Sequence, residues 1–137
     1  DIRSLVPHCG AMVLLDAVER WDAIEAVCAA CSHLDPDNPL RRAGRLGAAC
    51  GIEYGMQAAA VHGALLGGGV APPPGRLAAL RAVAWHVERL DDPGFGALRV
   101  TARLEGHDAG GLAYAFRVAA ADGLCLVEGR GLVALPR

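Results

Sequence analysis

The stretch GAACGIEYGMQAAAVHGALL, residues 47–66, is the longest apolar run of the chain and determines the predicted fold. Its length and nearly continuous apolar character predict one long buried helix over Gly47–Leu66. Glu53 interrupts the run, and a buried carboxylate is costly unless it is paired or used chemically. Gln57 follows four residues later, about 40° round the helix, so it shares a face with Glu53. This face is the candidate site.

The positions of three histidines predict whether each is buried or exposed to solvent. His62 lies roughly 180° from Glu53 on the same helix, so the two side chains cannot pair within it. We expect His62 to be a core histidine or a subunit-contact histidine. His86 alternates with Trp85 in an extended stretch, and His107 lies in a predicted turn. Both are therefore expected to face solvent.

The remaining segments are predicted to be strands and loops. Met12–Arg20 and Ile24–Cys31 are two strand-length runs that suggest a hairpin, and a polar loop over residues 32–45 leads to the helix. A connector rich in glycine and proline follows the helix. Beyond it, apolar and polar residues alternate with the two-residue period of strands. The predicted strands there include Val83–Val87, Leu98–Glu105, Leu112–Val118 and Leu124–Leu135.

An antiparallel sheet with one apolar face must cover that face, and only the 47–66 helix is long and apolar enough to do so. The predicted fold is therefore α+β: a curved antiparallel sheet wrapped around one long central helix, the hot-dog arrangement, in a single domain over residues 1–137. Such a sheet leaves exposed edges, and the helix is apolar on more sides than one sheet can cover. A homodimer is therefore expected.

Composition excludes several classes of function. All 13 basic residues are arginine, so lysine-dependent Schiff-base, pyridoxal phosphate and Walker A chemistry is excluded for this chain. The net charge of −2 and the few aromatic residues argue against a nucleic-acid partner. Polar residues within the long helix argue against a membrane span.

The cysteines predict no metal site. The five cysteines are odd in number and no signal-like segment opens the chain, so we expect reduced thiols and a cytoplasmic protein. Cys28 and Cys31 form a CxxC pair, but an extended stretch would place them on opposite faces. We expect neither a metal nor another cofactor.

Two motifs resemble a known family. Leu5-Val6-Pro7-His8 followed by Met12–Asp16 is similar to the opening of the β-hydroxyacyl-acyl carrier protein dehydratases, and Glu53-x-x-x-Gln57 resembles the motif of their central helix. More narrowly, PHxGxMxLLD with GIEYxxQAxAxHG looks like the dehydratase-like proteins of aryl polyene type biosynthesis clusters. The resemblance covers most of the chain in element order.

The resemblance implies a hot-dog dimer that receives an acyl chain on the phosphopantetheine of an acyl carrier protein. The implied reaction removes water from a 3-hydroxyacyl thioester. It needs a base near the C2 proton, an acid near the C3 hydroxyl and hydrogen-bond donors to the thioester carbonyl. Glu53 suits the carboxyl role, and amides near the helix start, around Gly47, suit the carbonyl. Gln57 would orient Glu53 or bind the substrate hydroxyl.

The catalytic histidine is where the chain departs from the family pattern. The usual Gly-His-Phe-Pro segment has no counterpart, because the matching interval holds Pro39-Leu40-Arg41-Arg42. In the alignment that we prefer, Asn38-Pro39 matches the family's Asn-x-Pro, and the usual catalytic histidine is lost. His8, beside the first strand, is then the leading substitute. His33, twenty residues before Glu53, matches only if the loop has grown.

Three functions follow as alternatives. The first is dehydration by Glu53 with a histidine, and the second is thioester hydrolysis, in which the carboxylate would activate water. The third is a non-catalytic acyl-carrier-binding subunit. Arg41, Arg42 and Arg45 would either form a solvated loop or attract an acidic carrier protein and its phosphate.

Overall fold

The computed structural model describes residues 2, 13–68, 76–108 and 111–134, and the fold is given for these residues. Within them lie one long helix, three short 3₁₀ turns and the strands of a single sheet. The helix is α1 (Gly51–Leu66), the 3₁₀ turns are Ser32–Leu34, Ala48–Cys50 and Pro93–Phe95, and the strands are β1 (Ala17–Trp21), β2 (Glu25–Ala30), β3 (Arg76–Trp85), β4 (Leu98–Asp108), β5 (Gly111–Ala119) and β6 (Cys125–Ala134).

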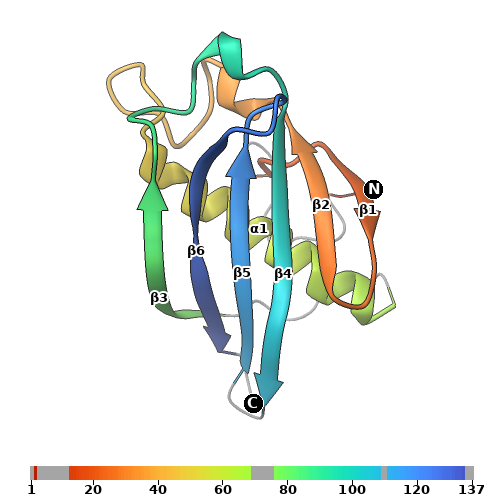
Figure 1. Cartoon of the computed structure of the whole chain (residues 1–137). Coiled ribbons are helices and arrows are strands. Elements are labelled where there is room, and N and C mark those ends of the chain that lie inside the picture. Colours follow the sequence, from red (N-terminus) through yellow and green to blue (C-terminus); the bar gives the residue numbers. More distant parts are fainter. Residues whose placement is uncertain (1, 3–12, 69–75, 109–110, 135–137) are drawn as a thin grey trace.

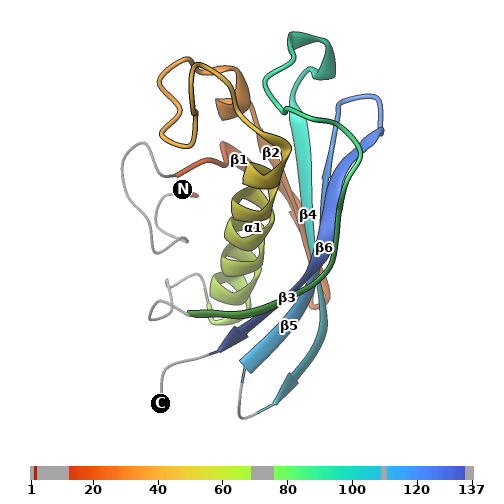
Figure 2. The ribbon, with the colours of Figure 1, turned by 90° about the vertical axis from the view of Figure 1, so that its left-hand side faces the viewer.

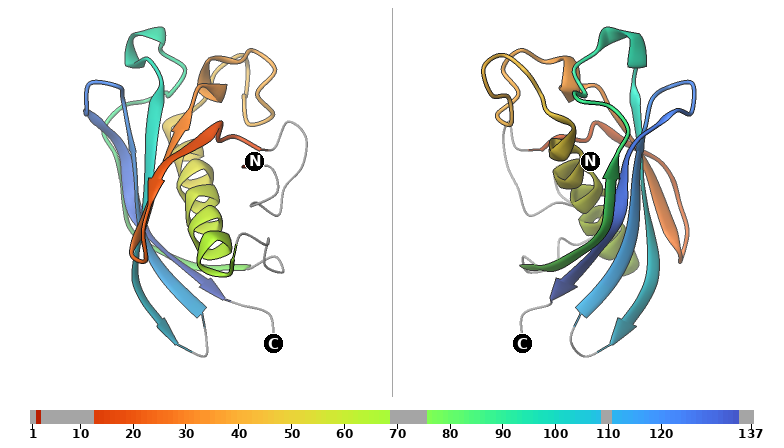
Figure 3. Two further views of the ribbon diagram at one scale, coloured as in Figure 1. Left: turned by 90° about the vertical axis from the view of Figure 1, so that its right-hand side faces the viewer. Right: turned by 60° about the vertical axis from the view of Figure 1, so that its left-hand side comes forward.

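The six strands form one antiparallel sheet in the order β1-β2-β4-β5-β6-β3. The helix α1 runs obliquely behind the strands (Figure 1), and the sheet curves round it (Figure 2). The strand that follows the helix, β3, forms one edge, and β1 forms the other (Figure 3). The prediction of a curved antiparallel sheet around one long helix is therefore confirmed.

Several predicted boundaries are wrong. The strand expected over Val83–Val87 is β3, which runs from Arg76 to Trp85, and two other boundaries fail because the backbone bonds to a distant residue. The helix begins at Gly51 rather than Gly47, because residues 48–50 form a 3₁₀ turn and the Ala48 N–H donates to the Glu88 carbonyl at 3.0 Å. The first strand begins at Ala17 rather than Met12. Ahead of it, the Leu14 N–H donates to the side chain of Gln57 instead of to a strand.

The helix approaches the sheet through its smallest residues. Gly55 lies directly against the ring of Phe116 on β5. A Cβ atom built at Gly51 would lie 2.8 Å from Cγ2 of Val127 on β6, which is closer than such contacts allow. Ala58, one turn further along, is fully buried. The absence of larger side chains at these positions sets the short distance between helix and sheet.

His62 fixes the rotation of α1 about its axis. Its ring is buried, with Nε2 2.9 Å from the Asp22 carbonyl and Nδ1 2.7 Å from the Tyr114 hydroxyl. Because a carbonyl only accepts, Nε2 carries the proton and Nδ1 accepts from the hydroxyl. Burial raises the pKa of Tyr114 to about 12, so the hydroxyl keeps its proton. The prediction of a core histidine is confirmed for His62.

The edge strand β3 is unusually exposed for an apolar strand. The large apolar residues Leu77, Leu80 and Trp85 are 44%, 40% and 54% exposed. Ala82 has a φ of +52°, in the left-handed region that non-glycine residues rarely adopt, where the pairing with β6 shifts register between Arg81 and Ala84. The strand therefore presents apolar side chains and a local irregularity at an edge of the sheet.

Because α1 lies so close to the sheet, we expect substitutions at two of its glycines to have opposite effects on stability. Gly55→Ala forces a methyl group into the Phe116 ring and should lower the free energy of unfolding by about 1–3 kcal/mol. At Gly63 the nearest atoms to a new Cβ lie at 4.0 Å, an ordinary contact. Gly63→Ala should therefore raise stability by up to about 1 kcal/mol through helix propensity.

Urea unfolding of both variants measures these effects. Gly63→Ala serves as the matched control, because it makes the same chemical change in the same helix. Equal shifts of the unfolding midpoint in the two variants would contradict a steric role for Gly55.

Candidate functional site

Glu53 and Gln57 lie on the face of α1 that points away from the sheet. Gly55 and His62 contact the sheet, and Glu53 is roughly 160–180° from each of them round the helix. Glu53 is half-buried and Gln57 is 1% exposed. The Gln57 Oε1 accepts the Leu14 N–H at 2.9 Å, so its carbonyl ties α1 to the residues before β1.

At the start of the helix, fewer backbone amides are available to a ligand than the sequence predicts. The Ala48 amide donates to Glu88, and the Cys50 and Gly51 amides donate to the Gly47 and Ala48 carbonyls. Among the residues that the structure describes, the amides of Gly47 and Ala49 have no acceptor. Gly47 has an ordinary φ of −64°, and a Cβ there would meet nothing within 4 Å. Neither backbone strain nor packing therefore requires glycine at this position.

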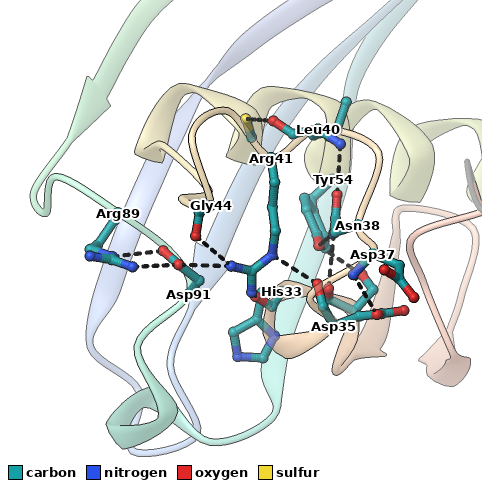
Figure 4. Close-up of polar contacts among 12 residues, drawn as sticks. His33, Asp35, Asp37, Asn38, Leu40, Arg41, Gly44, Tyr54, Arg89 and Asp91 are labelled. Atoms are coloured by element: carbon teal, nitrogen blue, oxygen red, sulfur yellow. Dashed lines mark hydrogen bonds and ion pairs between the residues drawn. The ribbon is translucent and has the colours of Figure 1, made fainter.

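The segment 32–45 is exposed along much of its length, but Ser32 and Asn38 tie it to the helix. Tyr54 is fully buried, and its hydroxyl lies 2.7 Å from Ser32 Oγ and 3.1 Å from Asn38 Nδ2 (Figure 4). Asn38 also donates to the Ser32 carbonyl at 2.9 Å, and Ser32 Oγ donates to the Leu14 carbonyl at 2.7 Å. Burial raises the pKa of the Tyr54 hydroxyl. These bonds hold the segment beside the first turns of α1.

Arg41 holds the other half of this segment. Its guanidinium donates to the carbonyls of Asp35, Gly44 and His33 at 2.8–3.0 Å, and to Asp91 Oδ2 at 3.2 Å (Figure 4). Its side chain is 15% exposed. Arg41 is therefore a structural residue and not part of a solvated loop. Arg42 and Arg45 remain exposed, and their backbones pair across a tight turn.

Asp91 is the carboxylate that anchors this arrangement. It lies six residues beyond the end of β3, and it accepts two hydrogen bonds from Arg89, at 2.8 and 2.6 Å, besides the one from Arg41. The Arg89 hydrogen bond holds the pKa of Asp91 well below its usual range, against the opposing effect of burial. The sequence does not reveal the role of Asp91, since Asp91 and Arg41 are far apart in the chain.

His33 lies under the Arg41 side chain (Figure 4). It is fully buried, and neither ring nitrogen has a hydrogen-bond partner among the described residues. Burial lowers the pKa of His33; the charge of Arg41 lowers it further, and the nearby backbone of Gly96 opposes both effects. The structure places a neutral imidazole here, packed beneath the segment that precedes the helix.

The other predicted residues are placed as follows. His8 lies outside the described residues. His86 and His107 are exposed as predicted, although His107 belongs to β4 rather than to a turn. Cys28 is buried, which raises the pKa of its thiol to about 12, whereas Cys31 is exposed. The two thiols of the CxxC pair therefore lie in different environments.

Because His33 is buried, we expect the folded protein to lose stability in mild acid. Its pKa is lowered in the folded protein, so below about pH 6.5 the unfolded chain binds more protons than the folded one. The free energy of unfolding should therefore fall as the pH drops below this value. His33→Gln, which cannot titrate, should reduce that slope in chemical unfolding measured between neutral and mildly acidic pH.

His107→Gln removes an exposed histidine and is the matched control, with an expected slope like that of the unaltered protein. An unchanged slope in His33→Gln would contradict the assignment of a buried neutral imidazole.

The chain matches the ApeP-like family model, described as ApeP dehydratase, over residues 1–137. No curated protein matches the sequence. Similar solved structures include the dehydratase heterocomplex ApeI:P from Xenorhabdus doucetiae, with a TM-score of 0.83 and 22% identity, over 99% of this chain and 91% of that chain. AziG from S. sahachiroi has a TM-score of 0.68 and 19% identity, over 97% of this chain and 99% of that chain.

A hypothetical thioesterase from Streptococcus pneumoniae TIGR4, solved with coenzyme A, has a TM-score of 0.63 and 11% identity, over 87% of this chain and 84% of that chain. These structures share the hot-dog fold, and at such low identity they establish the fold alone. No helix in the described part of the chain is long and apolar enough to cross a membrane. The match over the whole sequence shows that this chain belongs to the ApeP-like dehydratase family.

Proposed function

We propose that this protein removes water from a 3-hydroxyacyl thioester carried by an acyl carrier protein and forms the trans-2-enoyl thioester, in a fatty acid or polyene type pathway. One observation carries the proposal. In a chain of a dehydratase family, Glu53 is a half-buried carboxyl group on the face of the central helix that points away from the sheet. Dehydration requires an acid of this kind, held beside the substrate.

In the proposed reaction Glu53 acts as the acid and His8 as the base. His8 takes the C2 proton, and the electron pair of that C–H bond forms the new C2–C3 double bond. The C3–O bond breaks, and the hydroxyl leaves as water with the proton of protonated Glu53. Transfer of the proton from His8 back to Glu53 restores the starting state.

The length of the chain is compatible with this pairing. His8 precedes Leu14 by six residues, which span at most about 20 Å when extended. The Leu14 N–H is bound to Gln57, and Gln57 lies one helical turn from Glu53. His8 therefore belongs to a segment whose far end is attached beside the carboxyl group. His33 is the weaker candidate, since its ring is buried beneath Arg41.

Backbone amides near the helix start would polarise the thioester carbonyl. Gly47 and Ala49 supply the amides that the rest of the described structure leaves without acceptors. Gly47 has no side chain to obstruct a ligand that approaches. Gln57 would orient Glu53 or bind the substrate hydroxyl through its side-chain amide.

The exposed arginines near this end of the helix fit an acidic carrier protein. Arg42 and Arg45 are exposed on the segment that leads directly into Gly47. Their charges would attract the carrier protein and the phosphate of its phosphopantetheine arm. Arg41 is excluded from this role, because its donors are used within the fold.

A second subunit would cover the exposed edge strand. The side chains of Leu77, Leu80 and Trp85 lie on β3 at the edge of the sheet, where a strand of another chain can pair. We propose a homodimer formed along this edge. The similar structure from X. doucetiae is a heterocomplex, which makes a related dehydratase subunit the alternative occupant.

Mass spectrometry of a 3-hydroxyacyl carrier protein incubated with the protein tests the reaction. The unaltered protein should produce the loss of one water from the acyl carrier. Glu53→Gln removes the acid with little change of shape and should slow this loss by at least about 100-fold. Glu105→Gln, at an exposed position of β4, is the matched control and should retain full turnover.

The same assay distinguishes the histidines and the rival functions. His8→Ala should be as impaired as Glu53→Gln, whereas His33→Gln should retain turnover. The reverse pattern would transfer the role to His33. Release of unacylated carrier protein would show that the protein hydrolyses the thioester instead of dehydrating the acyl chain. An unchanged acyl carrier at every chain length would favour a non-catalytic binding subunit.

Sedimentation of the purified chain tests the β3 interface. Leu80→Lys places a charge on the exposed edge and should raise the dissociation constant of the dimer by at least about tenfold. Ile24→Lys introduces the same charge at a residue that is 47% exposed beside the opposite edge, and it should leave the dimer intact. A monomeric unaltered chain that associates only with a related dehydratase subunit would replace the homodimer by a heterodimer.

A further inference from the structure

Three potential metal ligands meet where β3 ends and β6 begins. His86 directly follows β3, and Cys125 and Glu128 lie on β6. The His86 Nε2 is 2.9 Å from Glu128 Oε2, and the Cys125 Sγ is 3.4 Å from the same oxygen. All three ligand atoms lie within 4.8 Å of one another. A nitrogen, a sulfur and an oxygen donor therefore converge on one point.

The backbone holds these three residues together. The His86 N–H donates to the Leu126 carbonyl at 2.9 Å, which fixes His86 beside β6. Residues three apart in a regular strand point to opposite faces, so Cys125 and Glu128 should not meet. The pairing of β5 with β6 shifts register between Val118 and Ala119, opposite the start of β6. This irregularity turns Cys125 toward the side of Glu128.

The donor set and spacing suit a zinc ion. Zinc binds sulfur at about 2.3 Å and nitrogen or oxygen at about 2.0–2.2 Å, so ligand atoms around a tetrahedral ion are roughly 3.3–3.7 Å apart. The observed separations of 2.9 Å, 3.4 Å and under 4.8 Å bracket this range. A thiolate together with an imidazole favours zinc over magnesium or calcium. We propose that His86, Cys125 and Glu128 bind one Zn²⁺ ion, with a fourth position open to water.

This site is separate from the proposed active site. Val127, between Cys125 and Glu128, contacts α1 at Gly51, whereas the Glu128 side chain is exposed on the opposite face of the sheet. A bound ion would therefore not reach Glu53. It would connect the end of the edge strand β3 to β6 and stabilise their pairing, which is interrupted by the register shift near Ala82.

Arg117 sets the affinity of the site. It lies directly opposite Glu128 in the pairing of β5 with β6, and both residues line the same cavity of about 370 Å³ on the sheet. A guanidinium this near repels a divalent cation. The His86 and Glu128 side chains are also 47% and 51% exposed, so solvent competes for the ion. Arg117→Gln should therefore tighten zinc binding several-fold.

Titration of the full chain with Co²⁺, followed by displacement with Zn²⁺, tests the site. Thiolate-bound cobalt gives a charge-transfer absorption band, which reports the cysteine ligand directly. The unaltered protein should show this band with one ion per chain, and Zn²⁺ should abolish it and raise the melting temperature. Cys125→Ser should lose the band, and His86→Asn and Glu128→Gln should each weaken binding by about tenfold or more.

Cys31→Ser alters an exposed cysteine outside the cluster and is the matched control. It should retain the band and the affinity. The proposal fails if Cys125→Ser binds cobalt as the unaltered protein does, or if the unaltered protein gives no thiolate band at millimolar Co²⁺. Dehydration is measured separately, so either result leaves the role of Glu53 unaffected.

Discussion

The contact between the Phe116 ring and the backbone of α1 at Gly55 sets the geometry on which the rest of the structure depends. A helix held this close to a curved sheet must present glycine and alanine to it, and its larger and polar residues must point elsewhere. His62 then fixes the helix rotation through one bond to the β1–β2 turn and another to β5. Glu53 and Gln57 consequently point away from the sheet.

The layout of strands and helix could be predicted from the sequence because it follows from local periodicity. Alternation over β4 and β5 and the apolar run of α1 specify a sheet that needs one helix to cover it. The boundaries failed where the backbone pairs with a distant partner. The Leu14 amide binds Gln57, and the Ala48 amide binds the Glu88 carbonyl. No local pattern reveals such contacts.

The candidate site, too, could be predicted from the sequence only in part. Glu53 and Gln57 could be found from the sequence, because polar residues on an apolar helix are conspicuous. The segment 32–45 was predicted as a polar loop, yet Arg41 and Asn38 bind it to Asp91 and Tyr54. A sequence does not show whether an arginine or an asparagine is solvated or held by hydrogen bonds within the fold. The cluster of His86, Cys125 and Glu128 could not be predicted, because it depends on an irregular register that only the folded sheet contains.

The strand order has a consequence for how the chain folds. β3 follows α1 directly, but its neighbour in the sheet is β6, the last strand, and Arg76 pairs with Ala134 across most of the second half of the chain. Closing so long a loop is slow, because its entropy must be lost before the contacts form. During synthesis the leucines of β3 therefore stay unpaired until β6 has emerged from the ribosome. The edge proposed for subunit pairing is therefore formed only after β6 has been synthesised.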